Sequence, residues 1–321
     1  MCVANILKAL GLSTATLVLS ACGGGGGANV ASIPPAPVVQ PPAPTPPRSS
    51  DITIFANPTP MEYVVVGTST KLGETPSSRY GVLSTAEADQ LQIRYSSAGY
   101  YEILLPGRSW DTLVSAAGYS PPSETNFQPN GFQNMAGLNL VPAKWAGYKY
   151  SEYGNWYARD TGRSGWIAFG IPTPAAGVPT TGTATYAGTV HGSADIMSTD
   201  MLSAPSYYPA YLDGKVTLSF DFQRGTLGGN MDLFMVTYRD PIAIGSYNFI
   251  NTIFSAGSTT YSGRFDTAVS GDNYFLGRFT GPTAQETIGT WAVPFVFSQG
   301  DADYPPDNQR HQAIGAWVAK Q

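Results

Sequence analysis

The second half of the chain alternates apolar and polar residues. In Lys215–Phe222 (KVTLSFDF) the even-numbered positions are Val, Leu, Phe and Phe, and the odd-numbered positions are polar. A period of two is that of a strand with one buried face. Seven further runs of strand-like sequence are Thr183–Val190, Met231–Tyr238, Tyr247–Phe254, Thr260–Asp266, Asn273–Thr280, Thr290–Phe297 and Gln312–Ala319.

Turn residues separate these eight runs, which favours a sandwich or barrel over a parallel sheet. Eight is the number of strands that closes a barrel whose interior is filled by side chains. Closure also removes the unpaired edges through which exported β-proteins aggregate. The predicted fold class is therefore all-β, with an eight-stranded antiparallel β-barrel.

The first half carries weaker strand patterns. Leu91–Tyr95 (LQIRY) and Tyr100–Leu105 (YYEILL) predict a hairpin whose turn is Ser96–Gly99. A Tyr- and Trp-rich segment follows, and the Pro-rich stretch Ile171–Thr180 predicts a junction before the barrel. Helical patterns are scarce, and Thr85–Gln90 is the best short candidate.

Residues 1–21 have the features of a cleavable secretory signal. Lys8 is their only charge, and the apolar run that follows it ends in small residues. This run is too short for a membrane-spanning helix, which needs ~20 apolar residues. Cleavage before Cys22 removes Cys2, the only other cysteine, and leaves one thiol with no partner.

The sequence Leu19–Cys22 (LSAC) resembles the bacterial lipobox, in which the cysteine becomes the lipidated first residue of the mature protein. Lipoproteins of this type carry two or three acyl chains, which is enough for stable anchoring. Gly23 stands where an aspartate would favour retention in the inner membrane, so the resemblance implies the outer membrane. The alternative is an ordinary secretory protein with a stray cysteine.

Residues 22–50 form the predicted anchor and tether. Gly23–Gly27 favours a flexible coil, and Ile33–Pro47 supplies eight prolines, which favour extended polyproline II. At ~3.1 Å per residue, the second stretch would reach about 45 Å. The alternative is a Pro-rich ligand for a groove on another protein.

Composition narrows the class of partner. Charged residues make up 12% of the chain, aromatic residues another 12%, and Gly and Pro together number 62, a mixture typical of short strands and tight turns. The formal net charge is −5, or −6 once Lys8 is removed with the signal. Without a Lys/Arg cluster, the chain lacks the electrostatic footprint of a nucleic-acid-binding protein.

The stretch Gly277–Trp291 (GRFTGPTAQETIGTW) resembles the closing motif of the transferrin-binding protein B family, roughly G-x-F-x-G-P-x-A-x-E-x-x-G-x-aromatic. Three positions depart from that pattern, namely Thr280 for Tyr, Ile288 for Gly and Trp291 for Phe. Thr181–Gly188 looks like the family's first barrel strand. The resemblance covers roughly Pro179–Phe297. The matching residues are Gly277, Phe279, Gly281, Pro282, Ala284, Glu286 and Gly289.

The resemblance implies a small β-rich handle domain at 51–177, before a barrel domain at 178–321. It implies one such lobe, because the motif occurs once. It also implies a monomeric lipoprotein on the bacterial surface that binds a host or environmental ligand, since the family includes transferrin-binding lipoproteins, factor H binding protein and haem-capturing relatives. The ligand is then a protein or an iron or haem source, and no ligand-contact residue can be carried over.

The motif also has a physical interpretation without the family. Gly281-Pro282 ends a strand, because proline has no N–H for the ladder. Glu286 is predicted to accept backbone N–H bonds at the following turn rather than to act chemically. The repeated Gly-Arg-Phe at 263–265 and 277–279 predicts two neighbouring strands of one hairpin.

Catalysis finds little support in the sequence. It contains no G-x-S-x-G elbow, phosphate loop or H-E-x-x-H motif. His191 lies on a polar strand face and is predicted to lie in solvent, and His311 is predicted to lie in a loop. Asp301 and Asp303 are expected in a solvated loop rather than as an acid/base pair. We therefore expect no enzyme activity, no cofactor and no metal.

Three functions remain open. The first is capture of a host or environmental macromolecule, such as an iron or haem source, by aromatic loop segments such as Tyr207–Tyr211 and Phe127–Phe132, because Tyr and Trp are enriched at interface hot spots. Each segment has the alternative of packing against its own domain. The second is a structural or adhesive envelope role with no soluble ligand. The third is direct haem binding with His191 or His311 as the axial ligand.

Overall fold

The computed structural model describes residues 60–71, 91–115, 126–129, 136–141, 146–196, 210–237, 239–302 and 304–321. Cys22, the signal 1–21, the tether 22–50 and the helix candidate Thr85–Gln90 lie outside these ranges. Strands dominate the described residues, and the short helical element there is the 3-10 turn η2 (Ala175–Gly177). No helix in these ranges is long and apolar enough to cross a membrane.

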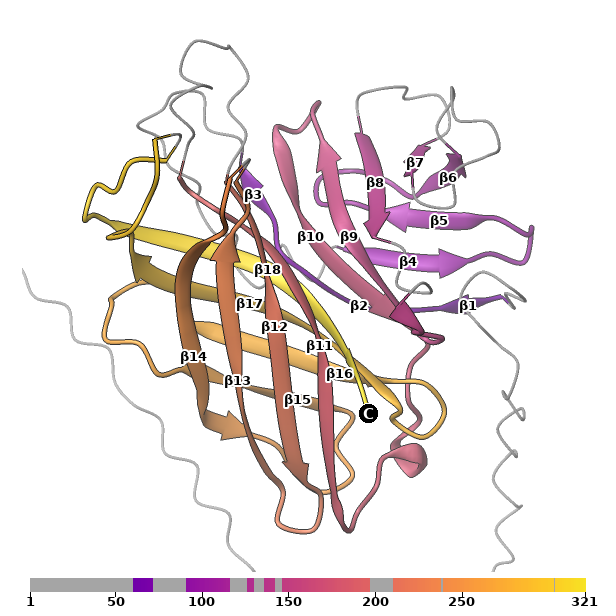
Figure 1. Cartoon of the computed structure of the whole chain (residues 1–321). Helices are drawn as coiled ribbons and strands as arrows, with labels where there is room; N and C mark the ends of the chain where they lie inside the picture. The colour runs from indigo at the N-terminus through magenta and orange to yellow at the C-terminus, as the bar shows by residue number, and fades with distance from the viewer. Residues whose placement is uncertain are drawn as a thin grey trace, which may run out of the picture. The chain divides into compact units, whose positions relative to one another are not determined.

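The barrel contains eight antiparallel strands that pair in chain order, and β11 pairs β18 to close it (Figure 1). This confirms the predicted fold class. The strands are β11 (Thr183–Ala194), β12 (Ala210–Asp221), β13 (Thr226–Met235), β14 (Ile242–Ile253), β15 (Thr260–Phe265), β16 (Tyr274–Thr280), β17 (Glu286–Val296) and β18 (Arg310–Lys320). Most of these strands are longer than the runs of sequence that predicted them. Strands β11, β12, β17 and β18 are examples.

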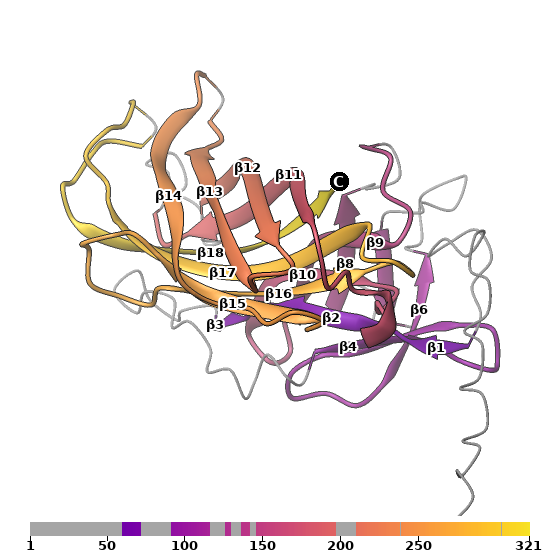
Figure 2. The same cartoon turned by 90° about the horizontal axis from the view of Figure 1, so that it is seen from below.

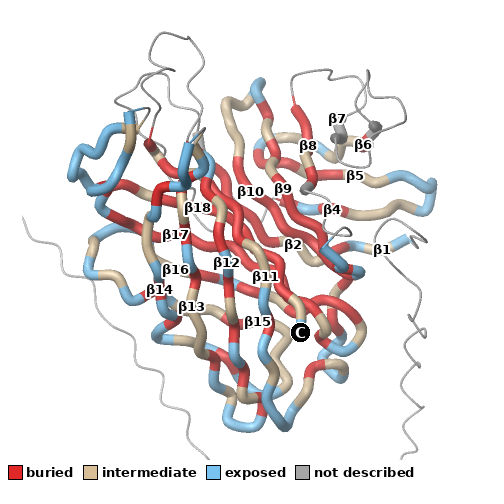
Figure 3. Tube along the Cα trace, in the orientation of Figure 1, coloured by how far each residue is buried: buried red, intermediate tan, exposed pale blue. Residues whose placement is uncertain are grey.

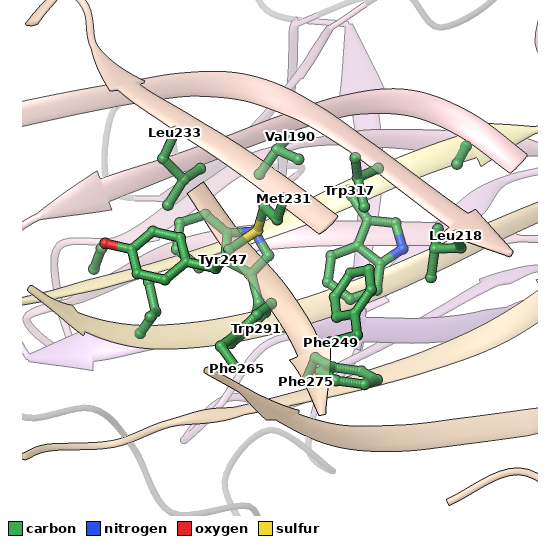
Figure 4. Packing of buried hydrophobic residues seen from close by; sticks show 14 of the residues in the cluster. Val190, Leu218, Met231, Leu233, Tyr247, Phe249, Phe265, Phe275, Trp291 and Trp317 are labelled. Atoms are coloured by element: carbon green, nitrogen blue, oxygen red, sulfur yellow. The ribbon is translucent and has the colours of Figure 1, made fainter. Parts of the chain in front are cut away.

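Large side chains fill the barrel interior (Figure 4). Two of them, Trp291 and Trp317, lie on adjacent strands, each directly opposite a glycine of its neighbour: Trp291 pairs Gly315, and Trp317 pairs Gly289. A Cβ atom at Gly289 would lie 2.1 Å from the ring of Trp317. Each indole therefore occupies the space that its partner glycine leaves, and a closed barrel of this size accommodates both.

The β15–β16 hairpin confirms the prediction from the repeated Gly-Arg-Phe. Tyr261 pairs Gly277, and Gly263 pairs Phe275, so each glycine again faces an aromatic ring across the ladder. The strand β16 ends at Thr280, directly before Gly281-Pro282, as predicted.

The handle is a ten-stranded sheet with the order β1-β4-β5-β6-β7-β8-β9-β10-β2, and β3 also pairs β10. The predicted hairpin is confirmed as β4–β5, and Gly99 in its turn has φ of 86°. The strands are β1 (Met61–Glu62), β2 (Val64–Gly67), β3 (Thr70–Lys71), β4 (Gln92–Tyr95), β5 (Tyr101–Leu104), β6 (Asp111–Ser115), β7 (Asn126–Pro129), β8 (Ala136–Val141), β9 (Ser151–Ala158) and β10 (Arg163–Gly170).

One run of chain joins both ends of the handle sheet. Within 61–67, β1 pairs β4 and β2 pairs β10, and the N–H of Tyr63 between them donates to the carbonyl of Ile93. The handle core inside this arrangement is apolar and includes Ile93, Ile103, Leu138, Trp156 and Phe169. The handle and barrel fall within one compact unit, Arg48–Gln321, and the domain limits 51–177 and 178–321 remain predictions.

The burial pattern shows where the handle covers the barrel (Figure 3). In β17, ten consecutive residues from Glu286 to Phe295 are buried, whereas β12 alternates regularly. A strand buried on both faces has core on one side and a second layer on the other. The second layer here comes from the handle, since Ile288, Ala316 and Val318 pack in one cluster with handle residues.

Candidate functional site at the handle–barrel junction

Glu286 binds the handle to the barrel. Its Oε1 accepts the N–H of Lys149 at 2.7 Å, and its Oε2 accepts the N–H of Tyr150 at 3.0 Å. Burial raises the pKa of this carboxyl above its usual value, although these bonds and the charge of Lys320 oppose the shift. The prediction that Glu286 accepts backbone N–H bonds is confirmed, and the donors belong to the handle rather than to the turn itself.

The turn before Glu286 makes the next contacts with the handle. Gly281 has φ of 83°, which favours glycine, and its N–H donates to the carbonyl of Ile171. The hydroxyl of Thr173 donates to the carbonyl of Gly281 at 2.7 Å. Thr280, a departure from the family pattern, forms a buried hydroxyl pair with Ser151 at 2.7 Å. The stretch that carries the family resemblance is therefore also the stretch that fastens the handle.

Apolar contacts complete this junction. Val66, Tyr148, Tyr153, Trp166 and Ala168 of the handle pack with Ile288, Ala316 and Val318 of β17 and β18. The hydroxyl of Tyr148 donates to the carbonyl of Val318 at 3.1 Å. The ammonium of Lys320 lies 5.2 Å from the centre of the Tyr148 ring, within cation–π range. Burial of this surface favours a fixed handle position.

His191 lies in this junction, and the prediction that it lies in solvent is wrong. The residue is only 8% exposed, because the rings of Tyr153 of β9 and Trp166 of β10 lie against its imidazole. Nε2 lies 3.0 Å from the hydroxyl of Tyr153 in the handle, and Nδ1 lies 2.5 Å from the hydroxyl of Tyr211 in the barrel. The imidazole therefore bridges the two parts.

The hydrogen bonds assign the imidazole proton. Thr189 donates to the hydroxyl oxygen of Tyr153, so the proton of that hydroxyl is available for Nε2 of His191. In the tautomer that fits this bond, Nδ1 carries the ring proton and donates to Tyr211. Burial lowers the pKa of His191 below its usual value, and the carboxylate of Asp213, 3.6 Å from Nδ1, opposes that shift. The neutral ring is thus the favoured form.

Trp166 extends the same cluster toward the surface. Its indole N–H donates to the hydroxyl of Ser193 at 2.9 Å, and its ring lies 6.1 Å from that of His191 and 5.4 Å from that of Tyr211. The residue Tyr211 is 36% exposed, and its hydroxyl is held by Nδ1 of His191. A fixed, partly exposed aromatic ring is suited to contact with a ligand.

The remaining aromatic contact candidates lie wholly or partly outside the described residues, and of the segment Phe127–Phe132 only residues 127–129 are described, in β7. Tyr207, Tyr208 and Pro209, which precede Tyr211, are outside the described residues, as are residues 130–132 of the segment Phe127–Phe132. Of the first segment, Ala210 and Tyr211 are described, and both belong to the start of β12 rather than to a loop.

His311 forms a second buried cluster, and the prediction that it lies in a loop is wrong. It is the second residue of β18 and is 5% exposed. Its Nδ1 lies 2.8 Å from Oδ1 of Asp195, and its Nε2 lies 3.1 Å from both carboxylate oxygens of Asp307. Burial alone would lower the pKa of His311, but the bonds to these two carboxylates and their charge raise it above its usual value.

The geometry leaves both histidines without a free ligating nitrogen. Each ring nitrogen of His191 and of His311 already lies within hydrogen-bond distance of a protein group. No group of three or more His, Cys, Asp and Glu side chains in the described ranges could hold a metal ion. Asp301 accepts the N–H of Tyr304 in a local turn, and Asp303 lies outside the described residues. Neither histidine therefore offers an unoccupied ring nitrogen to a ligand in this arrangement.

Sequence reasoning missed the bridge formed by Tyr153, Trp166 and His191. The one feature of the sequence that pointed to this bridge is the dense aromatic content of β9 and β10. Such content is equally expected of residues that form only the core of the handle. The sequence pattern does not predict which residue each ring contacts. Tyr153 and His191 are 38 positions apart, and their contact depends on how the two sheets dock.

No family model matches the sequence, and no curated protein matches it. Similar solved structures include a double mutant of transferrin-binding protein B from Haemophilus parasuis Hp5, at 15% identity and a TM-score of 0.44, over 80% of this chain and 45% of that one. Another is the haemoglobin receptor HpuA from Kingella denitrificans, at 14% identity and a TM-score of 0.37, over 84% of this chain and 91% of that one.

A third is transferrin-binding protein B from serogroup B Neisseria meningitidis, at 13% identity and a TM-score of 0.37, over 79% of this chain and 43% of that one. The chain thus spans less than half the length of the transferrin-binding structures that it matches. Two of these structures carry the name of the family that Gly277–Trp291 resembles.

Proposed function

We propose that this protein is a surface lipoprotein of the bacterial outer membrane that captures a macromolecular iron source. The observation that carries the proposal is the dock around Glu286. Residues that resemble the transferrin-binding protein B motif hold the handle against the barrel. The resembling residues therefore have a structural role in this molecule. A handle fixed to a barrel provides a rigid surface for recognition, without a catalytic centre.

The anchor is the first part of the proposal. Lipidation of Cys22 would fix the mature chain to the membrane, and the tether up to residue 50 would hold a monomeric binding domain away from it. Intact-mass measurement of the mature protein tests this directly. An acylated N-terminal cysteine is the expected result, and Cys22→Ala should release the protein from the membrane fraction, whereas an unmodified start elsewhere would contradict the anchor.

The ligand is the second part. Two of the similar structures are named for transferrin binding and one is a haemoglobin receptor, so transferrin and haemoglobin are the first proteins to try. The partly exposed ring of Tyr211, held by His191 and Trp166, is the proposed contact on the described surface. Haemin is a third probe, and the occupied histidine nitrogens predict that it binds to neither His191 nor His311.

Surface-based binding measurements with purified transferrin, haemoglobin and haemin test this part. Binding of transferrin or haemoglobin is expected, with a loss of roughly tenfold or more in Tyr211→Ala, the effect of removing one aromatic hot spot. Tyr100→Ala, which removes an exposed tyrosine from the handle hairpin, is the matched control. Failure of both proteins to bind, with an altered envelope but unchanged iron-limited growth in a deletion strain, would favour the structural or adhesive role.

A further inference from the structure

Three large apolar side chains gather on the outside of the barrel at β14 and β16. Ile253 is 71% exposed, Ile250 is 39% exposed and Leu276 is 38% exposed. Single exposed apolar residues are ordinary, whereas a contiguous group marks an interaction surface. The other large exposed apolar residues of the described part are spread over separate elements: Tyr100, Tyr211, Val236 and Val296.

The strand register brings the three side chains together. Ser262 of β15 pairs Ile253 on one side and Leu276 on the other, so these three residues form one row across the barrel wall. Ile250 pairs Arg264, one outward position further along β15. Figures 1 and 2 show β14, β15 and β16 in this part of the wall.

An irregularity in β14 makes the group possible. Ile250 and Ile253 are three residues apart, so in a regular strand their side chains would point to opposite faces. The β14–β15 register shifts between them, and Asn251 has φ of 49°, in the left-handed region. The resulting bulge leaves both isoleucines outside the barrel. Bulges that re-aim a side chain are typical of functional positions.

The same surface carries positive charge that the protein leaves unmatched. Arg264 is exposed, and no ion pair or hydrogen bond of its guanidinium occurs among the described residues. The nearby carboxylate of Asp266 already accepts the backbone N–H and the side-chain amide of Asn248, at 2.7 and 2.6 Å. Arg278 lies on β16, two positions beyond Leu276, and its Nε is buried without a hydrogen-bond partner.

We propose that Ile250, Ile253, Leu276 and Arg264 form a docking surface for a protein segment that carries a carboxylate between apolar side chains. The guanidinium of Arg264 matches a carboxylate with two parallel hydrogen bonds, and the apolar side chains bury the flanking residues. A membrane surface is the less suitable partner, because attraction to anionic lipid relies on clusters of Lys and Arg. This inference is independent of the proposed iron source.

Site-specific photo-crosslinking in cells that produce the full chain tests the proposal. Benzoylphenylalanine is placed at Ile253 or Ser262, and at Val296 as an exposed apolar control on β17. We expect a protein adduct from the first two positions and none from the third. Mass spectrometry of the adduct should identify a segment with Asp or Glu between apolar residues.

Charge reversal then decides whether Arg264 recognises that segment. Arg264→Glu should reduce the adduct by about tenfold or more, as expected for loss of an interfacial charge pair, while Lys215→Glu, on the outer face of β12, should leave it unchanged. A synthetic peptide of the segment with its acid replaced by Lys should bind the Arg264→Glu protein better than the original. An adduct with lipid, with a second copy of this chain, or insensitive to Arg264→Glu would overturn the proposal, as would no adduct above the Val296 control.

Discussion

The outer wall of the barrel has two regions that differ in what lies against them. On β17 and β18 the outward residues Ile288, Ala316 and Val318 pack under the handle. On β13 and β15 the outward residues Asp232 and Arg264 are exposed to solvent. Apart from a few residues such as Thr287, the inward side chains are apolar in both regions, whereas the outward side chains depend on which strands the handle covers.

The two histidines show the same contrast at the level of single side chains. His191 lies on the covered wall, where hydroxyl groups surround it and its neutral form is favoured. His311 lies near the end of the barrel wall between two carboxylates, where the charged form is favoured. Identical side chains, both buried, therefore respond to acid in opposite ways because of the groups beside them.

The largest expected effect is on unfolding free energy, when the same isoleucine-to-alanine substitution is made in the covered and in the exposed region of the barrel wall. Ile288→Ala removes a fully buried side chain from the junction and should cost about 3 kcal/mol of unfolding free energy. Ile250→Ala changes an exposed side chain and should stay within about 0.5 kcal/mol. Urea unfolding of both variants measures the difference, and equal costs would mean that the handle does not cover β17 in solution.

The dock around Glu286 gives the second effect. Glu286→Ala leaves the N–H groups of Lys149 and Tyr150 without their acceptor and should cost about 2 kcal/mol. Glu286→Gln keeps one carbonyl oxygen and should lose less. Limited proteolysis provides a second measurement, because cleavage near Lys149 should become faster in Glu286→Ala. A stable, protease-resistant Glu286→Ala protein would show that apolar packing alone holds the handle.

The smallest effect is the opposite pH response of the histidines. Since the pKa of His311 is raised by folding, its contribution is fully present below about pH 6.5 and is lost as pH rises through the folded pKa. Since the pKa of His191 is lowered, its contribution is present above about pH 6.5 and is lost as pH falls through the folded pKa. In a curve of stability against pH, His311→Asn should remove the loss of stability on raising the pH, and His191→Asn should remove the loss on lowering it. The same direction of change in both variants would refute the assignment.

Much of the barrel follows from the sequence, and the junction does not. Alternation located all eight strands, and Gly281-Pro282 located the end of β16. The sequence pattern begins β17 at Thr290, four residues late, because its first inward residues are Thr287 and Gly289 while the outward Ile288 is apolar, which hides the period of two. The threonines beside His191 led to the wrong prediction that its side chain lies in solvent. A polar strand face lies in solvent only where no second layer of structure covers it.

The run at 61–67 closes the handle, and this has a mechanical consequence. Tension that reaches the fold from the chain before Met61 meets hydrogen bonds to both ends of the handle sheet, first those of β1 to β4 and then those of β2 to β10. Among the described residues, no other handle strand precedes β1 and β2 along the chain. The hydrogen bonds of β1 and β2 would thus bear such a load first, and the barrel strands, which follow them in the chain, would bear it only after those bonds break.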